Sequence, residues 1–260
     1  MIDTHSHIYS TEFDADRAEV IQRAKDIGVK QIILPNCDSE TLPQMLALEA
    51  ACPGYCHATI GLHPTSVKED YTEELALVKS ELKRRDYLAI GEIGIDLYWD
   101  KTFYNEQVLV FRQQLEWALE YQLPVIIHVR DSFRDSMNAL EEFRGRGLTG
   151  VFHSFTGTFE EAQEILAFGG FKLGINGIVS FKNSGLAAVV EKIDLKHLLI
   201  ETDSPYLTPA PHRGKRNESA YVSLVCEKIA SVKNLSVSEV DKITTQNALE
   251  LFTKLPEKRL

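Results

Sequence analysis

Two histidines close to the start of the chain have a spacing that suits metal ligands. His5 and His7 end a short apolar run and are separated by one residue. On a β-strand, residues two apart point to the same face, so both imidazoles can reach one ion. Two histidines near a terminus are also often a solvated polar tip, so the pair alone leaves both interpretations open.

Metal-ligating side chains also follow other apolar runs of the sequence. Together with the first pair they supply four imidazoles and two carboxylates, which belong to His5, His7, Glu92, His128, His153 and Asp203. These nitrogen and oxygen donors suit Zn²⁺, Mn²⁺, Co²⁺ or Ni²⁺, and Mg²⁺ is also compatible with them. They are too many for one catalytic ion that keeps an open position. Two ions that share a bridging carboxylate would use them all, and such a centre suits phosphoester hydrolysis.

The order of the expected elements predicts a (β/α)8 barrel of the TIM type. Short apolar runs predict strands near residues 1–5, 30–34, 56–60, 87–91, 124–128, 149–153, 171–174 and 197–201. Helical periodicity lies between them and is clearest over residues 103–122. Eight such units fit a closed parallel barrel better than an open sheet, and the Gly-x-Gly-x-x-Gly and P-loop patterns are missing. The active site of such a barrel lies at the C-terminal ends of the strands, where these side chains are expected.

Two further helices are expected after the eighth strand, near residues 219–233 and 238–253. Ser236 or Ser238 is expected to cap the second helix. Both helices are expected to pack on the outside of the barrel. No linker, repeat or low-complexity segment interrupts the chain, which predicts one domain over residues 1–260.

The composition predicts a soluble cytoplasmic protein. No apolar stretch approaches the roughly 18 to 20 residues of a membrane helix, and the first strand leaves no room for a signal peptide ahead of it. The spacing of the four cysteines fits neither a zinc or redox site nor a disulfide scaffold, so reduced thiols are expected. The net charge of -10 argues against broad binding along a polyanion. It leaves room for a small phosphate pocket built on metal cations.

Several motifs of the chain resemble those of the TatD family of metal-dependent deoxyribonucleases, within the amidohydrolase-like superfamily. The resemblance covers nearly the whole chain and rests on residues 2–7, 60–64, 90–96, 124–131, 153–157, 201–205 and 213–218. Ser154 stands where the family commonly has cysteine, and Ser219 stands where it commonly has proline. Neither departure removes a predicted ligand.

The resemblance implies how the ligands are divided between two divalent ions. His5 and His7 would hold one ion with Asp203, and Glu92 would bridge both ions. The second ion would be completed by His128 and His153. Mg²⁺ or Mn²⁺ is the ion expected in use, while Zn²⁺, Ni²⁺ or Co²⁺ can also bind.

Three carboxylates are expected to act in catalysis: Glu92 through the ions it would bridge, and Asp203 and Glu201 directly. The ions would supply an activated water, and Asp203 is expected to orient this water and take its proton, with pure ligation as the alternative. Glu201 lies two residues earlier on the same strand face. It is expected to orient a histidine or to contact the substrate, with a structural hydrogen bond as the alternative.

Three side chains are expected to bind the substrate phosphate. Arg130 lies two residues beyond His128 and can clamp a phosphate through two hydrogen bonds. His63 matches a family position that contacts the phosphate. Arg213 leads the densest basic run, residues 212–216, for which a solvated loop is the default interpretation. Tyr98 and Trp99 are left open between base stacking and loop packing.

The expected activity is 3′ to 5′ hydrolysis of DNA phosphodiester bonds, as the resemblance implies. The partner would be single-stranded DNA or DNA ends, without a membrane and without an obligate protein partner. The same metals can also hydrolyse another ester or an amide, such as the ester of an aminoacylated tRNA. A metal-stabilised binding protein without turnover is the interpretation from another class. The three phosphate-binding candidates favour the phosphodiester.

Overall fold

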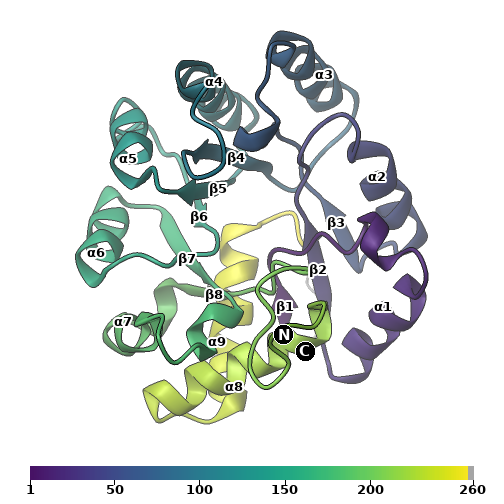
Figure 1. Ribbon diagram of the computed structural model, residues 1–260, viewed down its shortest axis with the longest axis vertical. Coiled ribbons are helices and arrows are strands. Elements are labelled where there is room, and N and C mark those ends of the chain that lie inside the picture. Colours follow the sequence, from purple (N-terminus) through teal and green to yellow (C-terminus); the bar gives the residue numbers. More distant parts are fainter. Residues whose placement is uncertain (257–260) are drawn as a thin grey trace.

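Eight parallel strands alternate with helices around a barrel, as the computed structural model shows for residues 1–256 (Figure 1). The strands are β1 (Ile2–Asp3), β2 (Gln31–Leu34), β3 (Cys56–Ala58), β4 (Ile90–Asp96), β5 (Val125–Arg130), β6 (Gly150–Phe152), β7 (Phe171–Ile175) and β8 (Leu198–Ile200). The helices are α1 (Arg17–Asp26), α2 (Leu42–Ala51), α3 (Tyr71–Arg84), α4 (Tyr104–Tyr121), α5 (Phe133–Glu141), α6 (Phe159–Phe168), α7 (Leu186–Lys192), α8 (Val222–Lys233) and α9 (Val237–Leu251). This order confirms the predicted (β/α)8 barrel.

The strands follow one another around the barrel in sequence order. β1, β2 and β3 form one hydrogen-bonded sheet, and β4 to β8 form a second. Isolated bridges between Ile60 and Ile90 and between Ser6 and Ser204 join the two sheets at both seams. The Ser6 and Ser204 hydroxyls lie 2.7 Å apart across the second seam. The ring is therefore closed by contacts between the first and last strands.

The fourth strand is the one whose position differs most from the prediction. The sequence predicts a strand over residues 87–91, whereas β4 runs from Ile90 to Asp96 and is buried throughout. Its second half pairs with β5 as far as the partners Asp96 and Arg130. Polar residues that the prediction placed after the strand are therefore part of it.

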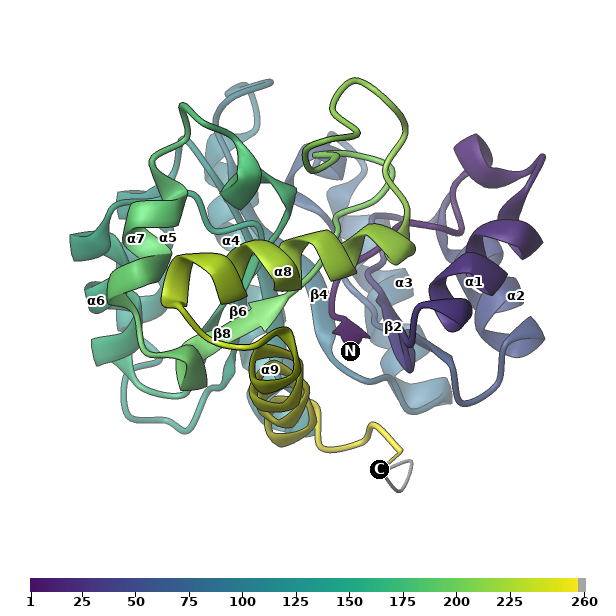
Figure 2. The same ribbon diagram turned by 90° about the horizontal axis from the view of Figure 1, so that it is seen from below.

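The helix α9 covers the end of the barrel where the strands begin, as Figure 2 shows. Its Leu251 and the following Phe252 pack against strand residues that line the lower interior, which are Ile2, Ile33, Ile126, Val151 and Leu199. Asn247 donates to the backbone carbonyl oxygens of Leu195 and Leu198 at 2.8 Å. The expectation of outer packing is therefore wrong for α9, because periodicity identifies an apolar face without showing what covers it.

The capping residues of α9 agree with one of the two predicted alternatives. The Ser236 hydroxyl accepts from the Glu239 backbone N–H, and the Glu239 carboxylate accepts from the Ser236 N–H in return. This reciprocal pair is a capping box. None of the described helices is both long and apolar enough to cross a membrane.

Truncating Phe252 is expected to destabilise the barrel without changing the structure at the C-terminal ends of the strands. The Phe252→Ala variant leaves a cavity under the strands and should lower the free energy of unfolding by about 3 to 5 kcal/mol. Val237→Ala, at an exposed position at the start of the same helix, is the matched control and should stay within about 0.5 kcal/mol of the parent. Chemical denaturation measures both values, and an unchanged midpoint for Phe252→Ala would contradict the packing described here.

Candidate metal centre

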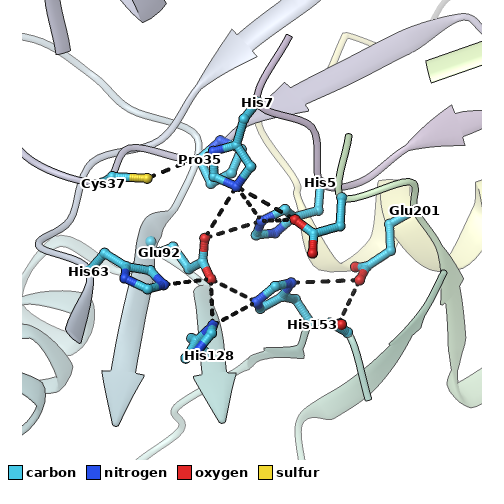
Figure 3. Close-up of polar contacts among 12 residues, drawn as sticks. His5, His7, Pro35, Cys37, His63, Glu92, His128, His153 and Glu201 are labelled. Carbon is cyan, nitrogen blue, oxygen red and sulfur yellow. Dashed lines mark hydrogen bonds and ion pairs between the residues drawn. The ribbon is translucent and has the colours of Figure 1, made fainter. Parts of the chain in front are cut away.

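The six predicted metal ligands meet at the C-terminal ends of the strands (Figure 3). In a first group, the Nε2 atoms of His5 and His7 lie 3.2 Å apart, and each is 3.7 Å from Oδ1 of Asp203. Oε2 of Glu92 lies 3.2 Å from the His5 nitrogen and 3.5 Å from the His7 nitrogen. Four potential donors thus converge on one point.

A second group forms on the other oxygen of Glu92. Oε1 lies 2.7 Å from Nε2 of His153 and 2.9 Å from Nδ1 of His128, and these two nitrogens are 3.3 Å apart. Nε2 of His63 lies 3.2 Å from the same oxygen. Glu92 therefore presents one carboxylate oxygen to each group, which is the arrangement that a bridging ligand requires.

The distances between imidazole nitrogens fit the size of a metal ion. Two ligands held about 2.1 Å from one ion at tetrahedral or octahedral angles are separated by about 3.0 to 3.4 Å. The pairs His5 with His7 and His128 with His153 are separated by 3.2 and 3.3 Å. The donor set is also one of imidazoles and carboxylates that suits divalent transition metals. The residues present therefore fit a divalent ion in each group.

The backbone of β4 is shaped to bring Glu92 to this position. The register with β5 shifts between Ile90 and Ile93, and the Glu92 N–H instead donates to the carbonyl of Asn36 at 3.0 Å. Gly94 has a φ of +148°, and a Cβ there would lie 2.0 Å from the carbonyl oxygen of His128. Only glycine permits this close approach of β4 to the strand that carries His128.

Two histidines have hydrogen-bond partners on their far nitrogens, while their near nitrogens face Glu92. Tyr9 donates its hydroxyl hydrogen to the carbonyl of Pro35 at 2.6 Å, so its oxygen accepts from Nδ1 of His7 at 2.8 Å. The Nε2 atom of His128 donates to Oδ2 of Asp96 at 2.9 Å. Each ring therefore carries a hydrogen on the side away from Glu92. Burial acts to lower the pKa of both rings, but the groups beside them, Glu92 among them, raise it. A divalent ion would take the place of a proton on the near nitrogen, as in metal-binding histidines.

His63 carries its hydrogen on the nitrogen that faces Glu92. Its Nδ1 accepts from the Thr65 backbone N–H at 3.1 Å and lies 2.6 Å from the Thr65 hydroxyl. Burial lowers the pKa of His63, which favours the neutral ring. The neutral ring then holds its hydrogen on Nε2 and donates toward Glu92. This geometry fits the predicted substrate contact and leaves His63 outside the ligand set.

Glu201 lies behind His153, on the side away from Glu92 (Figure 3). Its Oε1 accepts from the Ser154 N–H at 2.6 Å and is 3.6 Å from Nδ1 of His153. Gly174 leaves room for this carboxylate, because a Cβ there would lie 2.2 Å from Oε2 of Glu201. Glu201 has no exposed surface. The hydrogen bond to Ser154 is the structural alternative of the prediction, and the contact with His153 is an ion-pair distance. Orientation of His153 by Glu201 stays a prediction.

Burial and mutual charge shift the protonation of the centre. Burial acts to raise the pKa of Glu92, but the nearby His153, His63 and His5 hold it well below its ordinary value. Burial raises the pKa of Asp203 to about 6, although His153 and His7 act to lower it. Burial also keeps the pKa of His5 well below its ordinary value. Protons and metal ions compete for these atoms, so metal affinity is expected to fall in acid.

The predicted phosphate-binding arginines differ from the other arginines of residues 1–256. Arg130 and Arg213 form no ion pair in this part of the chain, and each places its guanidinium over an aromatic ring, that of Tyr98 or Phe181. The other described arginines all pair with carboxylates, and they are Arg17, Arg23, Arg84, Arg85, Arg112, Arg134, Arg144, Arg146 and Arg216. Within the basic run, Arg213 thus keeps its charge available to a ligand.

Sequence reasoning missed three side chains that contact the predicted ligands. Asp96 lies four residues after Glu92 on the same strand, and this even spacing places it on the same face as the ligand. Tyr9 lies in the turn that follows His7, and no strand spacing marks it. Cys37 has its sulfur 3.8 Å from Nδ1 of His7, and with His7 and Glu92 it forms a further group that could hold a metal. No spacing signal marks this cysteine. All four cysteines are free thiols.

The Asp96→Asn variant is expected to bind metal more weakly. The amide cannot hold the hydrogen of His128 as the carboxylate does, and the loss of such a contact typically weakens metal binding by about 10- to 100-fold. Asp100→Asn changes a carboxylate that is half-exposed on the same loop and is the matched control. Calorimetric titration of the metal-free proteins with Mn²⁺ measures the effect, and equal affinities for Asp96→Asn and the parent would refute it.

Comparisons with known proteins agree with these observations. A sequence model described as TatD related DNase matches residues 2–253. The chain is 40% identical to an uncharacterized metal-dependent hydrolase, YabD of Bacillus subtilis (strain 168), over 97% of this chain and 98% of that protein. It is 31% identical to the 3′-5′ ssDNA/RNA exonuclease TatD of Pantoea vagans (strain C9-1), over 97% and 99% of the two chains.

A solved structure has the same fold. The crystal structure of YJJV, a TatD homolog from Escherichia coli K12, superposes with a TM-score of 0.90 at 29% identity, over 97% of this chain and 98% of that chain. The sequence matches extend over nearly all of the chain and include the segments that carry the metal centre. They confirm the resemblance of the motifs, and the chain belongs to the TatD related DNase family of metal-dependent hydrolases.

Proposed function

We propose that the protein is a divalent-metal-dependent deoxyribonuclease that removes nucleotides from DNA in the 3′ to 5′ direction. The observation that carries this proposal is the pair of unpaired arginines, Arg130 and Arg213, which stand on strand ends or loops of the face that holds the metal centre. An acidic chain that leaves only these described guanidinium groups free beside a cluster of metal ligands is suited to an anionic phosphodiester.

The proposed roles are metal binding, orientation of water and phosphate binding. His5, His7 and Asp203 would hold one ion, His128 and His153 would hold the other, and Glu92 would face both. When bound, divalent ions lower the pKa of a water ligand and neutralise charge on the phosphate. Asp203 orients the attacking water and accepts its proton. The Nε2 hydrogen of His63 is donated to a phosphate oxygen, and the two arginines bind the phosphates on either side of the mouth.

The direction of cleavage and the preference for single strands are proposed from the similarity to relatives. The TatD protein of Pantoea vagans is described as a 3′-5′ ssDNA/RNA exonuclease, and we extend the 3′ to 5′ direction and a preference for single strands or DNA ends to this chain. Mg²⁺ or Mn²⁺ is proposed as the working ion. The free thiols support a reducing location such as the cytoplasm.

The shared carboxylate leads to a prediction about metal content. Glu92→Gln keeps the side chain's size but removes its charge, so both of the two proposed ions should be lost. His7→Ala removes a ligand of the first group only and should leave the ion held by His128 and His153. Elemental analysis after dialysis measures ions per chain. His197→Ala, a histidine outside the centre, is the control, and loss of both ions in His7→Ala would contradict the division.

Activity on end-labelled single-stranded DNA tests the function. With Mg²⁺ or Mn²⁺ the parent should shorten a 5′-labelled strand progressively from its 3′ end, and a chelator should abolish this. Arg130→Ala or Arg213→Ala should lower kcat/KM by about 10- to 100-fold, because each removes a charged hydrogen bond to phosphate. Arg146→Ala removes an exposed, paired arginine and should leave kcat/KM unchanged.

Two results would overturn the proposal. One is the absence of metal-dependent cleavage of DNA with either label. The other is faster hydrolysis of an aminoacyl ester or amide than of DNA, with no effect of the two arginine substitutions, which would assign the centre to a different bond.

A further inference from the structure

The exposed aromatic side chains of residues 1–256 all lie on the face that carries the metal centre. Tyr98 and Trp99 lie between β4 and α4, and Tyr206 lies on the loop after β8. Their exposed fractions are 53%, 69% and 56%. The other exposed large apolar side chains of this part are aliphatic, and they are Ile27, Leu109, Leu235 and Val237. A tryptophan that leaves most of its surface in water contributes little to loop packing.

The loop that carries Tyr98 and Trp99 is fixed to the metal centre by one buried carboxylate. Oδ1 of Asp96 accepts from the backbone N–H groups of Tyr98 at 2.9 Å and Trp99 at 3.3 Å. Oδ2 of the same side chain accepts from Nε2 of His128. The backbone that carries the two aromatic rings is thus held at a set position relative to a predicted metal ligand.

The guanidinium group of Arg130 lies over the same two rings. Its guanidinium carbon lies 3.9 Å from the ring centre of Tyr98 and 5.1 Å from that of Trp99. The rings meet edge to face, with centres 4.9 Å apart at an interplanar angle of 86°. A guanidinium group that stacks through its face keeps its N–H edges available for a phosphate. An open indole and an unpaired cation therefore lie side by side.

We propose that Trp99, supported by Tyr98 and Arg130, is a platform on which one unpaired base of the DNA substrate stacks while Arg130 holds a phosphate of the same strand. This inference rests on the proposed nuclease function and adds the residue that selects the strand. Base faces inside a duplex are covered by neighbouring bases, so an exposed ring can stack on an unpaired base or on the last base of an end but not on an internal base pair. Stacking also gives this acidic chain an attraction for the strand that does not depend on phosphate charge.

Fluorescence tests contact with the base independently of cleavage. The chain has two tryptophans, so Trp117→Phe leaves Trp99 as the reporter. With a chelator present to prevent turnover, single-stranded oligothymidylate should quench this fluorescence. A closed circular duplex, which has no ends, and a strand of abasic sugar-phosphate units should not. If Trp117→Phe does not fold, the difference between the parent and Trp99→Phe gives the same signal. No quenching by the single strand, or equal quenching by the abasic strand, would overturn the platform.

Affinity and kinetics give a second, independent test. Trp99→Ala should weaken binding of the single strand about tenfold and raise KM by the same factor while kcat is kept, because one stacked base is lost. The dependence of log affinity on log salt should stay unchanged in Trp99→Ala, whereas Arg130→Ala should lower its slope by about 0.7, the value for one phosphate of a single strand. Leu109→Ala, which removes an exposed side chain on α4, is the control.

The outcomes separate this proposal from the nuclease proposal. Equal affinity of Trp99→Ala and the parent for the single strand, together with metal-dependent cleavage, would overturn the platform and leave the nuclease standing. Quenching of Trp99 by the single strand without cleavage of any DNA would overturn the nuclease and support the platform as a binding site.

Discussion

The carboxylate of Glu92 lies among five imidazole rings, and the arrangement of the site depends on it. One oxygen faces His5 and His7, and the other faces His63, His128 and His153. A carboxylate buried this deeply is unfavourable by itself. Its charge is kept because the surrounding rings lower its pKa. A single side chain therefore fixes the relative position of both groups of donors, and an irregular β4 with glycine at position 94 is what places it there.

The far sides of the rings matter as much as the sides that face Glu92. Tyr9 and Asp96 take hydrogens from the far nitrogens of His7 and His128, so the near nitrogen of each ring faces Glu92. Thr65 does the reverse for His63 and makes it a donor. Residues of the same type, a few ångströms apart, thus have different chemistry because their outer hydrogen-bond partners differ. The proposed division into ligands and substrate contacts rests on these partners as well as on distance.

Much of the fold and the convergence of the candidate ligands could be predicted from the sequence, because both follow from periodic signals. The eight apolar runs mark the strands, and a barrel brings the polar residue that follows each run to one end. Contacts that depend on how far β4 extends could not be predicted. Asp96 was placed beyond a strand expected to end at residue 91, so its bonds to both His128 and the Trp99 loop were not foreseen.

The position of α9 was missed for a related reason. The apolar face of a helix shows that it is buried, but the sequence does not say whether it lies along the barrel wall or across its open end. Only the contact of Phe252 with side chains from several strands distinguishes the two. Pairings that join distant parts of the chain carry no local signal in a single sequence.

The seam between the first and last strands has a consequence for assembly. Ser6 and Ser204, whose hydroxyls meet there, are 198 positions apart in the chain, and His5, His7 and Asp203 flank them. This group of donors exists only after the ring has closed, whereas Glu92, His128 and His153 come from neighbouring strands of one sheet. A ligand that binds only the folded state stabilises it by mass action. A cation held at the seam would therefore act as a clasp that makes opening of the barrel less favourable, in addition to its part in the chemistry.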